Sequence, residues 1–252
     1  MNLPKTVALA AAAVALVGSL ACRKQASTPT GGQETGGAVE VWPGMMTTVG
    51  ELANEWKAPW RNGGFLLKKG KRPERHVRRV ATCADLSGLV EDDFVPGPEW
   101  ERYNFREQSI LCRVLEAVMA ARPARVDHVR ELVNAEDPGD LLPASVAPPA
   151  LPAQAGRAAT SWHAVDPTLK LDREGARPGY REWLAHGAYN GRVTWWAAGD
   201  FDGDGFEDAV LFVNLSPAPG GDGGAGATTF MRAVVLTRRQ AGGPVTVVKL
   251  FE

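Results

Sequence analysis

A proline- and alanine-rich stretch, Pro138–Ala159, most limits how this chain of 252 residues can fold. Proline removes a backbone amide and clashes with the preceding turn, so the stretch cannot hold a long helix and is expected to be an extended linker or a surface loop. The hydrophobic pattern differs on its two sides, because residues 45–137 are mostly helical in pattern and residues 160–252 are rich in strands and glycine. The sequence therefore predicts an α+β chain, with an amino-terminal helical domain followed by an antiparallel β-sheet domain.

Individual elements can be placed on either side of this stretch. Before it, apolar residues repeat at helical spacing over Glu99–Ala121, a shorter helix is expected over Val49–Lys57, and Pro123 can open a third helix. After it, four runs rich in β-branched and aromatic residues are predicted to be strands of an antiparallel meander: Arg192–Ala198, Asp208–Leu215, Thr228–Arg238 and Pro244–Phe251. The run Val210–Val213 is apolar at consecutive positions, so its strand should be central and covered on both faces.

The amino end has the features of an export signal. Lys5 precedes the apolar run Thr6–Leu20, which is shorter than the roughly 20 residues that a membrane-spanning helix needs. Residues 1–21 are therefore expected to be a signal peptide. The segment Ser19–Cys22 resembles the Leu-[Ala/Ser]-[Gly/Ala]-Cys box of bacterial lipoproteins, and its last two residues match that box. The resemblance implies that the signal is removed and that Cys22 is acylated.

Residues 22–44 would then form the lipidated cysteine and a flexible tether, because Arg23–Val39 is rich in Gly, Ser, Thr and Gln and has almost nothing to bury. We expect a lipid-anchored protein of the cell envelope, at the outer membrane or on the periplasmic face. Its partners are expected to be the membrane, through the anchor, and a protein or glycan of the envelope. Ser19 and Leu20 depart from the lipoprotein box, so secretion without an anchor is the alternative. The formal net charge of −1 gives no sign of a nucleic-acid partner.

The cysteine count agrees with export. When Cys22 is set aside, Cys83 and Cys112 remain as a pair, and an oxidising compartment favours a disulfide between them. The alternative is two buried thiols.

A basic run, Lys68–Arg79, contains seven lysine or arginine residues. Such a run can meet anionic lipid headgroups or acidic glycans. More often it is a solvated face, balanced here by acidic residues nearby in sequence, and that is the interpretation we favour.

The sharpest chemical feature is the acidic segment Gly199–Asp208, whose sequence is GDFDGDGFED. Aspartates occupy positions 1, 3, 5 and 9 of a tight loop: Asp200, Asp202, Asp204 and Asp208. Carboxylates this close repel one another unless a cation joins them, and an all-oxygen ligand set favours calcium. Gly205 would permit the sharp turn, and the backbone carbonyl of Phe206 would be a further ligand. Position 12 is Leu211 instead of the bidentate glutamate of an EF-hand, which excludes that motif.

The segment resembles the D-x-D-G-D-G-x-x-D loop of FG-GAP and VCBS-type β repeats, in which the loop joins two strands. The resemblance implies a calcium loop in a β-hairpin, and the single copy gives no reason to expect a propeller. The alternative is an acidic turn without an ion, since Asp and Gly are favoured turn residues.

No catalytic motif stands out, because the four histidines are scattered and neither His-Glu-x-x-His nor Gly-x-Ser-x-Gly is present. We therefore expect a non-enzymatic, calcium-binding lipoprotein that acts as a binding or structural module of the envelope. The alternative is an envelope hydrolase acting on glycan or peptide, with an active site that no motif marks.

The lipoprotein interpretation predicts that Cys22 carries the acyl group. In cells supplied with a labelled fatty-acid analogue, the wild type should take up label and Cys22→Ser should lose it, because the thiol is the point of attachment. Ser27→Ala, in the same segment, is the matched control and should keep the label. Equal label in wild type and Cys22→Ser, or none in the wild type, contradicts the anchor.

Overall fold

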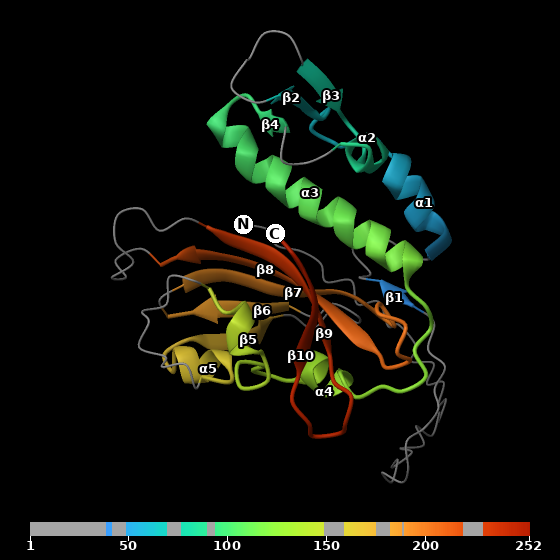
Figure 1. Cartoon of the computed structure of the whole chain (residues 1–252). Coiled ribbons are helices and arrows are strands. Elements are labelled where there is room, and N and C mark those ends of the chain that lie inside the picture. The colour runs from blue at the N-terminus through green and yellow to red at the C-terminus, as the bar shows by residue number, and fades with distance from the viewer. Residues whose placement is uncertain are drawn as a thin grey trace, which may run out of the picture. The chain divides into compact units, whose positions relative to one another are not determined.

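A computed structural model describes residues 39–41, 49–69, 77–89, 94–148, 159–174, 182–187, 189–218 and 229–252. All of these residues belong to one compact unit, Gln33–Glu252. They form two antiparallel sheets and five α-helices (Figure 1), which confirms the prediction of a mixed fold with antiparallel sheets. The predicted signal peptide, Cys22 and most of the predicted tether lie outside the described residues. Among the helices that are described, none has both the length and the apolar character needed to cross a membrane.

The larger sheet has the strand order β10-β9-β8-β7-β6-β5, and β1 pairs with the end of β7. Its strands are β1 (Glu40–Val41), β5 (Lys170–Glu174), β6 (Glu182–His186), β7 (Tyr189–Gly199), β8 (Asp208–Pro217), β9 (Phe230–Thr237) and β10 (Thr246–Phe251). The four predicted strands correspond to β7 through β10. The sequence reasoning missed β5 and β6, which extend the sheet at one side.

The central strand β8 is covered on both faces, as its consecutive apolar residues predicted. Leu211 and Val213 belong to one hydrophobic core, whereas Val210 and Phe212 belong to another. Because side chains alternate along a strand, the two cores lie on opposite faces of the sheet.

Helix α3 (Glu99–Ala120) covers one face of the large sheet (Figure 1). The other elements of this layer are α1 (Val49–Lys57), α2 (Cys83–Ser87) and a small sheet of strands β2 (Phe65–Lys69), β3 (Val77–Val80) and β4 (Phe94–Pro96). Ile110 and Val114 of α3 share a core with Leu67 of β2 and Phe212 of β8. The predicted helices at 49–57 and 99–121 are confirmed within one residue. The small sheet was not predicted from sequence.

The opposite face of the large sheet is covered by α4 (Arg130–Asn134), a 3-10 helix (Ala144–Val146) and α5 (Trp162–Val165). In the proline-rich stretch, residues 138–148 are described, and they bury Leu142 and Val146 in this core. That part of the stretch is therefore packed against the sheet, which differs from the expected linker or surface loop. The boundaries of the two predicted domains stay a prediction.

The predicted disulfide between Cys83 and Cys112 is present, with the two Cα atoms 5.2 Å apart. It joins the first turn of α2 to the middle of α3. The start of α2 is fixed by a capping box, in which Thr82 accepts from the amide of Asp85 and Asp85 accepts from the amide of Thr82. Both cysteines are 2% exposed, so the bridge lies in the core between the helices.

Loss of this disulfide is expected to destabilise the chain. It closes a loop with a sequence separation of 29, and a loop of this length restrains the unfolded chain by about 3–4 kcal/mol in the chain-entropy model. The double variant Cys83→Ala/Cys112→Ala should therefore unfold at lower denaturant concentration than the oxidised wild type. Wild type kept in reductant is the control and should shift in the same direction. A double variant as stable as the wild type would contradict this expectation.

Candidate metal centre

The acidic loop Asp200–Glu207 joins the paired ends of β7 and β8. The two strands are hydrogen-bonded up to the pair Gly199↔Asp208, so both ends of the loop are fixed by the sheet. Gly203 and Gly205 have φ values of 85° and 91°, which residues with a Cβ atom rarely adopt. These glycines let the backbone reverse direction within the loop, as the sequence predicted for Gly205.

Backbone amides of the loop hold two of the aspartate side chains. Asp200 accepts hydrogen bonds from the amides of Gly203 and Gly205, at 2.7 and 3.0 Å. Asp208 accepts one at Oδ2 from the amide of Phe201, at 2.8 Å. These hydrogen bonds hold the two carboxylates inside the loop.

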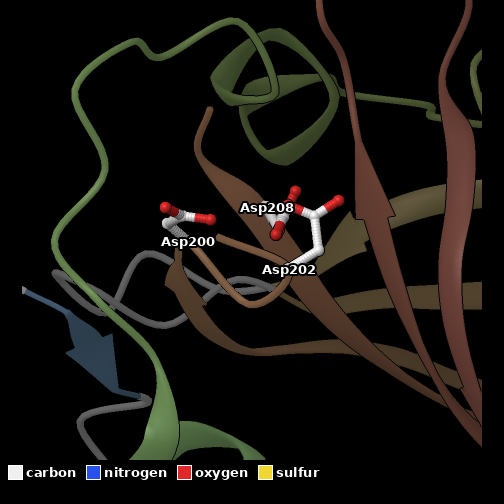
Figure 2. Close-up of side chains that lie close together, drawn as sticks. All are labelled: Asp200, Asp202 and Asp208. Carbon is white, nitrogen blue, oxygen red and sulfur yellow. The ribbon is translucent and has the colours of Figure 1, made fainter. Parts of the chain in front are cut away.

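Three of the four predicted carboxylates converge. Asp200, Asp202 and Asp208 each place an oxygen within 4.8 Å of the other two (Figure 2), so this group could hold a metal ion. Asp204 lies outside it, because its Oδ2 accepts a hydrogen bond from Arg239 Nε at 2.9 Å and its Oδ1 accepts the Phe206 amide. The predicted roles of Asp204 and of the Phe206 carbonyl as ligands stay predictions.

Asp208 supplies an observation that points to a ligand beyond the acidic cluster itself. Its side chain is 0% exposed, and Oδ1 has no hydrogen-bond partner among the described residues. The hydroxyl of Thr237, which is paired with Asp208 on β9, also lacks a well-formed hydrogen bond, although it is close enough to lower the pKa of Asp208. A buried carboxylate oxygen without a partner is costly, and a cation bound between the carboxylates would satisfy it.

The charge state of Asp208 reflects this burial. The pKa of Asp208 is raised to about 6, mainly by burial and also by the neighbouring carboxylates Asp202 and Asp204, while the Thr237 hydroxyl and the Phe201 amide oppose the rise. Near neutral pH the group is therefore mostly ionised despite its surroundings, which is the condition in which it would bind a cation.

Arg239, in the turn between β9 and β10, lies against the outer side of the loop. Its Nε is 2.9 Å from Asp204 Oδ2, and its Nη2 is 3.5 Å from Asp202 Oδ2. This guanidinium neutralises part of the negative charge, but it does not contact Asp208. Sequence reasoning missed it, because Arg239 is 35 residues away from Asp204 and belongs to no motif.

The segment that follows α3 forms backbone hydrogen bonds with the loop. Arg122 and Asp200 exchange two backbone hydrogen bonds, and the amides of Arg125 and Val126 both donate to the carbonyl of Gly205. These bonds explain why the helix expected to open at Pro123 begins only at Arg130. The intervening amides bind the loop instead of helix carbonyls.

A partly buried ion pair adds to these contacts. Arg130 donates to both carboxylate oxygens of Glu207, at 2.6 and 2.5 Å, and to Glu40 of β1 at 2.8 Å. Burial raises the pKa of Glu207, and the Arg130 guanidinium opposes that rise. The residue next to Asp208 is thereby tied to both α4 and β1.

A pocket of about 350 Å³ lies beside the loop. It is lined by Ala120, Arg122, Asp200, Phe201, Asp202 and Gly203. Two of the three residues with converging carboxylates therefore line it. Comparison with protein-family models, with curated proteins and with solved structures finds no match to this chain.

The buried carboxylate predicts an unusual pH dependence for the metal-free protein. The pKa of Asp208 is higher in the folded chain than in the unfolded one, so the unfolded chain loses its proton first as pH rises. Protonated Asp208 therefore makes its full contribution to the free energy of unfolding below about pH 4. That contribution is lost as pH rises through about 6.

Asp208→Asn should remove this loss, because an amide stays neutral and can donate to Asp200 or Asp202. In EDTA at pH 7, the variant should be more stable than the wild type by up to about 3 kcal/mol, and the difference should shrink towards pH 4. Urea unfolding across this pH range measures it. A wild type and a variant with parallel pH profiles would show that Asp208 does not titrate as described.

Proposed function

We propose that this protein is a calcium-binding lipoprotein of the cell envelope, in which the ion stabilises a non-enzymatic binding or structural module. The observation that carries the calcium part is the buried Oδ1 of Asp208, which lacks a partner and lies in a group of three converging carboxylates. A bound cation would both satisfy this oxygen and offset the repulsion within the group.

Calcium fits the chemistry of the site better than other common ions. The site offers carboxylate oxygens only, with neither thiolate nor imidazole, which disfavours zinc and copper. Calcium accepts six to eight oxygens in irregular geometry, whereas magnesium prefers a strict octahedron and keeps its waters. The Phe206 carbonyl, water from the pocket, and Asp204 after release from Arg239 could complete such a shell.

Within this proposal the β7–β8 turn is a calcium hairpin. The ion would fix the loop, which forms backbone hydrogen bonds with Arg122, Arg125 and Val126. It would thereby stabilise the junction between the sheet and the chain leaving α3. The effect is that of a structural ion, because the buried carboxylates Asp200 and Asp208 would hold it against the sheet.

Placement in the envelope rests on the export signal and on Cys22, and the Cys83–Cys112 disulfide agrees with an oxidising compartment. Strand β1 of the large sheet would then follow the anchor and its tether.

Calcium should raise the melting temperature of the purified protein, and EDTA should lower it. At a hundredfold excess over Kd, binding to the folded state adds about 2.7 kcal/mol, which corresponds to a shift of roughly 5–10 °C in a chain of this size. Magnesium should have a smaller effect. Asp202→Asn should lose most of the calcium response, whereas Asp172→Asn, at an exposed position on β5, should keep it. Identical melting curves in calcium and EDTA contradict the proposal.

A further inference from the structure

The small sheet has one buried face and one exposed face. On β2, Phe65 and Leu67 are buried in the core shared with α3, whereas Leu66 lies on the other side because side chains alternate along a strand. Lys68 follows on the same side as Leu66. The outward face of the sheet is therefore set by the even-numbered residues of β2.

The strand register shows which residues share this outward face. Lys68 is paired with Val77 on β3 and with Val95 on β4, and Leu66 is paired with Arg79. Residues directly opposite one another in an antiparallel sheet project to the same side. These five side chains, which we call the apolar–basic face, form two neighbouring rows across the sheet.

The apolar members of this face are unusually exposed. Leu66, Val77 and Val95 are 56%, 53% and 47% exposed, the three highest values among the large apolar side chains of the described residues. Single exposed apolar residues are normal, but three on one small sheet, bordered by charges, indicate an interaction surface.

The charged members are both basic. No salt bridge joins Lys68 or Arg79 to a carboxylate within the part of the chain that the structure describes, and Arg79 Nη2 donates to the carbonyl of Gly63. None of the five side chains can accept a hydrogen bond. The face therefore offers hydrogen-bond donors beside apolar side chains. A matching partner would present hydrogen-bond acceptors next to an apolar layer.

We propose that the apolar–basic face docks on a membrane surface that carries anionic lipid headgroups. Leu66, Val77 and Val95 would enter the boundary between headgroups and acyl chains, while Lys68 and Arg79 would bind phosphates at the headgroup level. A protein partner would call for matched donors and acceptors, which this face lacks. Since the formal net charge of the chain is −1, the attraction arises from this face and not from the protein as a whole.

The length of the chain before β1 agrees with such docking, and this step alone rests on the proposed anchor. From Arg23 to Val39 there are 17 residues, which span about 60 Å at full extension and about 20 Å on average if flexible. An acylated Cys22 would hold Val39, just before β1, within that distance of the bilayer, so the face would be concentrated near the membrane and a weak affinity would suffice for contact.

Vesicle flotation with the mature chain, residues 22–252 carrying Cys22→Ser, tests the docking without any contribution from an acyl group or from the apolar run Thr6–Leu20. Binding to phosphatidylglycerol-containing vesicles should exceed binding to pure phosphatidylcholine vesicles, and the excess should fall as salt is raised. Lys68→Gln/Arg79→Gln should weaken the excess binding by roughly 25-fold, at about fivefold per charge. Leu66→Ser/Val95→Ser should weaken it by at least tenfold.

Matched variants elsewhere serve as controls. Val247→Ser/Leu250→Ser removes exposed apolar groups from β10, and Lys57→Gln/Lys170→Gln removes two exposed charges, and neither pair should change the excess binding. Variants of the apolar–basic face are compared only where their melting temperatures equal that of the parent chain.

Three outcomes overturn the inference: no preference of the parent chain for anionic vesicles, undiminished binding by the face variants, or an equal loss in the control pairs. Sedimentation of the parent chain gives a further test. If the chain is a dimer that Leu66→Ser dissociates while vesicle binding is unchanged, the face binds a second copy of the chain and not a membrane. Every chain in the vesicle test lacks the acyl site, so a failure to bind vesicles would not contradict the proposed anchor. Conversely, a wild type without fatty-acid label would not contradict vesicle binding by this face.

Discussion

One carboxylate buried at the start of the central strand is the constraint around which the site is built. Asp208 is paired with Gly199 on β7 and with Thr237 on β9, so the sheet holds it on both sides. The residues that follow it, Ala209–Val213, are buried and form parts of both cores, so the strand cannot shift to expose the acid. A buried charge needs a partner, and at Oδ1 the described residues supply none. A proton satisfies this oxygen below about pH 6, and the group of three carboxylates could hold a cation that satisfies it at neutral pH.

The same loop connects elements that are far apart in the sequence. Its backbone binds the segment after α3, and Glu207 binds Arg130 and through it β1. These contacts connect the loop to the chain after α3, to α4 and to β1. A structural ion at this point would stabilise the connection between the two layers as well as the hairpin.

Local patterns in the sequence predicted the features that depend on local physics. The periodicity predicted α3, and the apolar run predicted that β8 is covered on both faces. The aspartate spacing predicted an acidic cluster, in which three of the four carboxylates converge. The cysteine count predicted the disulfide. Features set by contacts distant in sequence were missed. The small sheet pairs short strands in a region of helical pattern, and Arg239 reaches Asp204 from a turn with no motif. The helix expected to begin at Pro123 begins later, because the amides of the residues after Pro123 donate to the acidic loop. Helix propensity alone cannot predict these contacts.

Calorimetric titration of metal-stripped protein with calcium tests the central claim most directly, because it counts the ions that the folded chain binds. The account predicts one calcium ion per chain in the wild type and no heat of binding in Asp208→Asn, whose buried side chain cannot supply the charge. A wild type that gives no heat at millimolar calcium, or an Asp208→Asn chain that binds as tightly as the wild type, would contradict it.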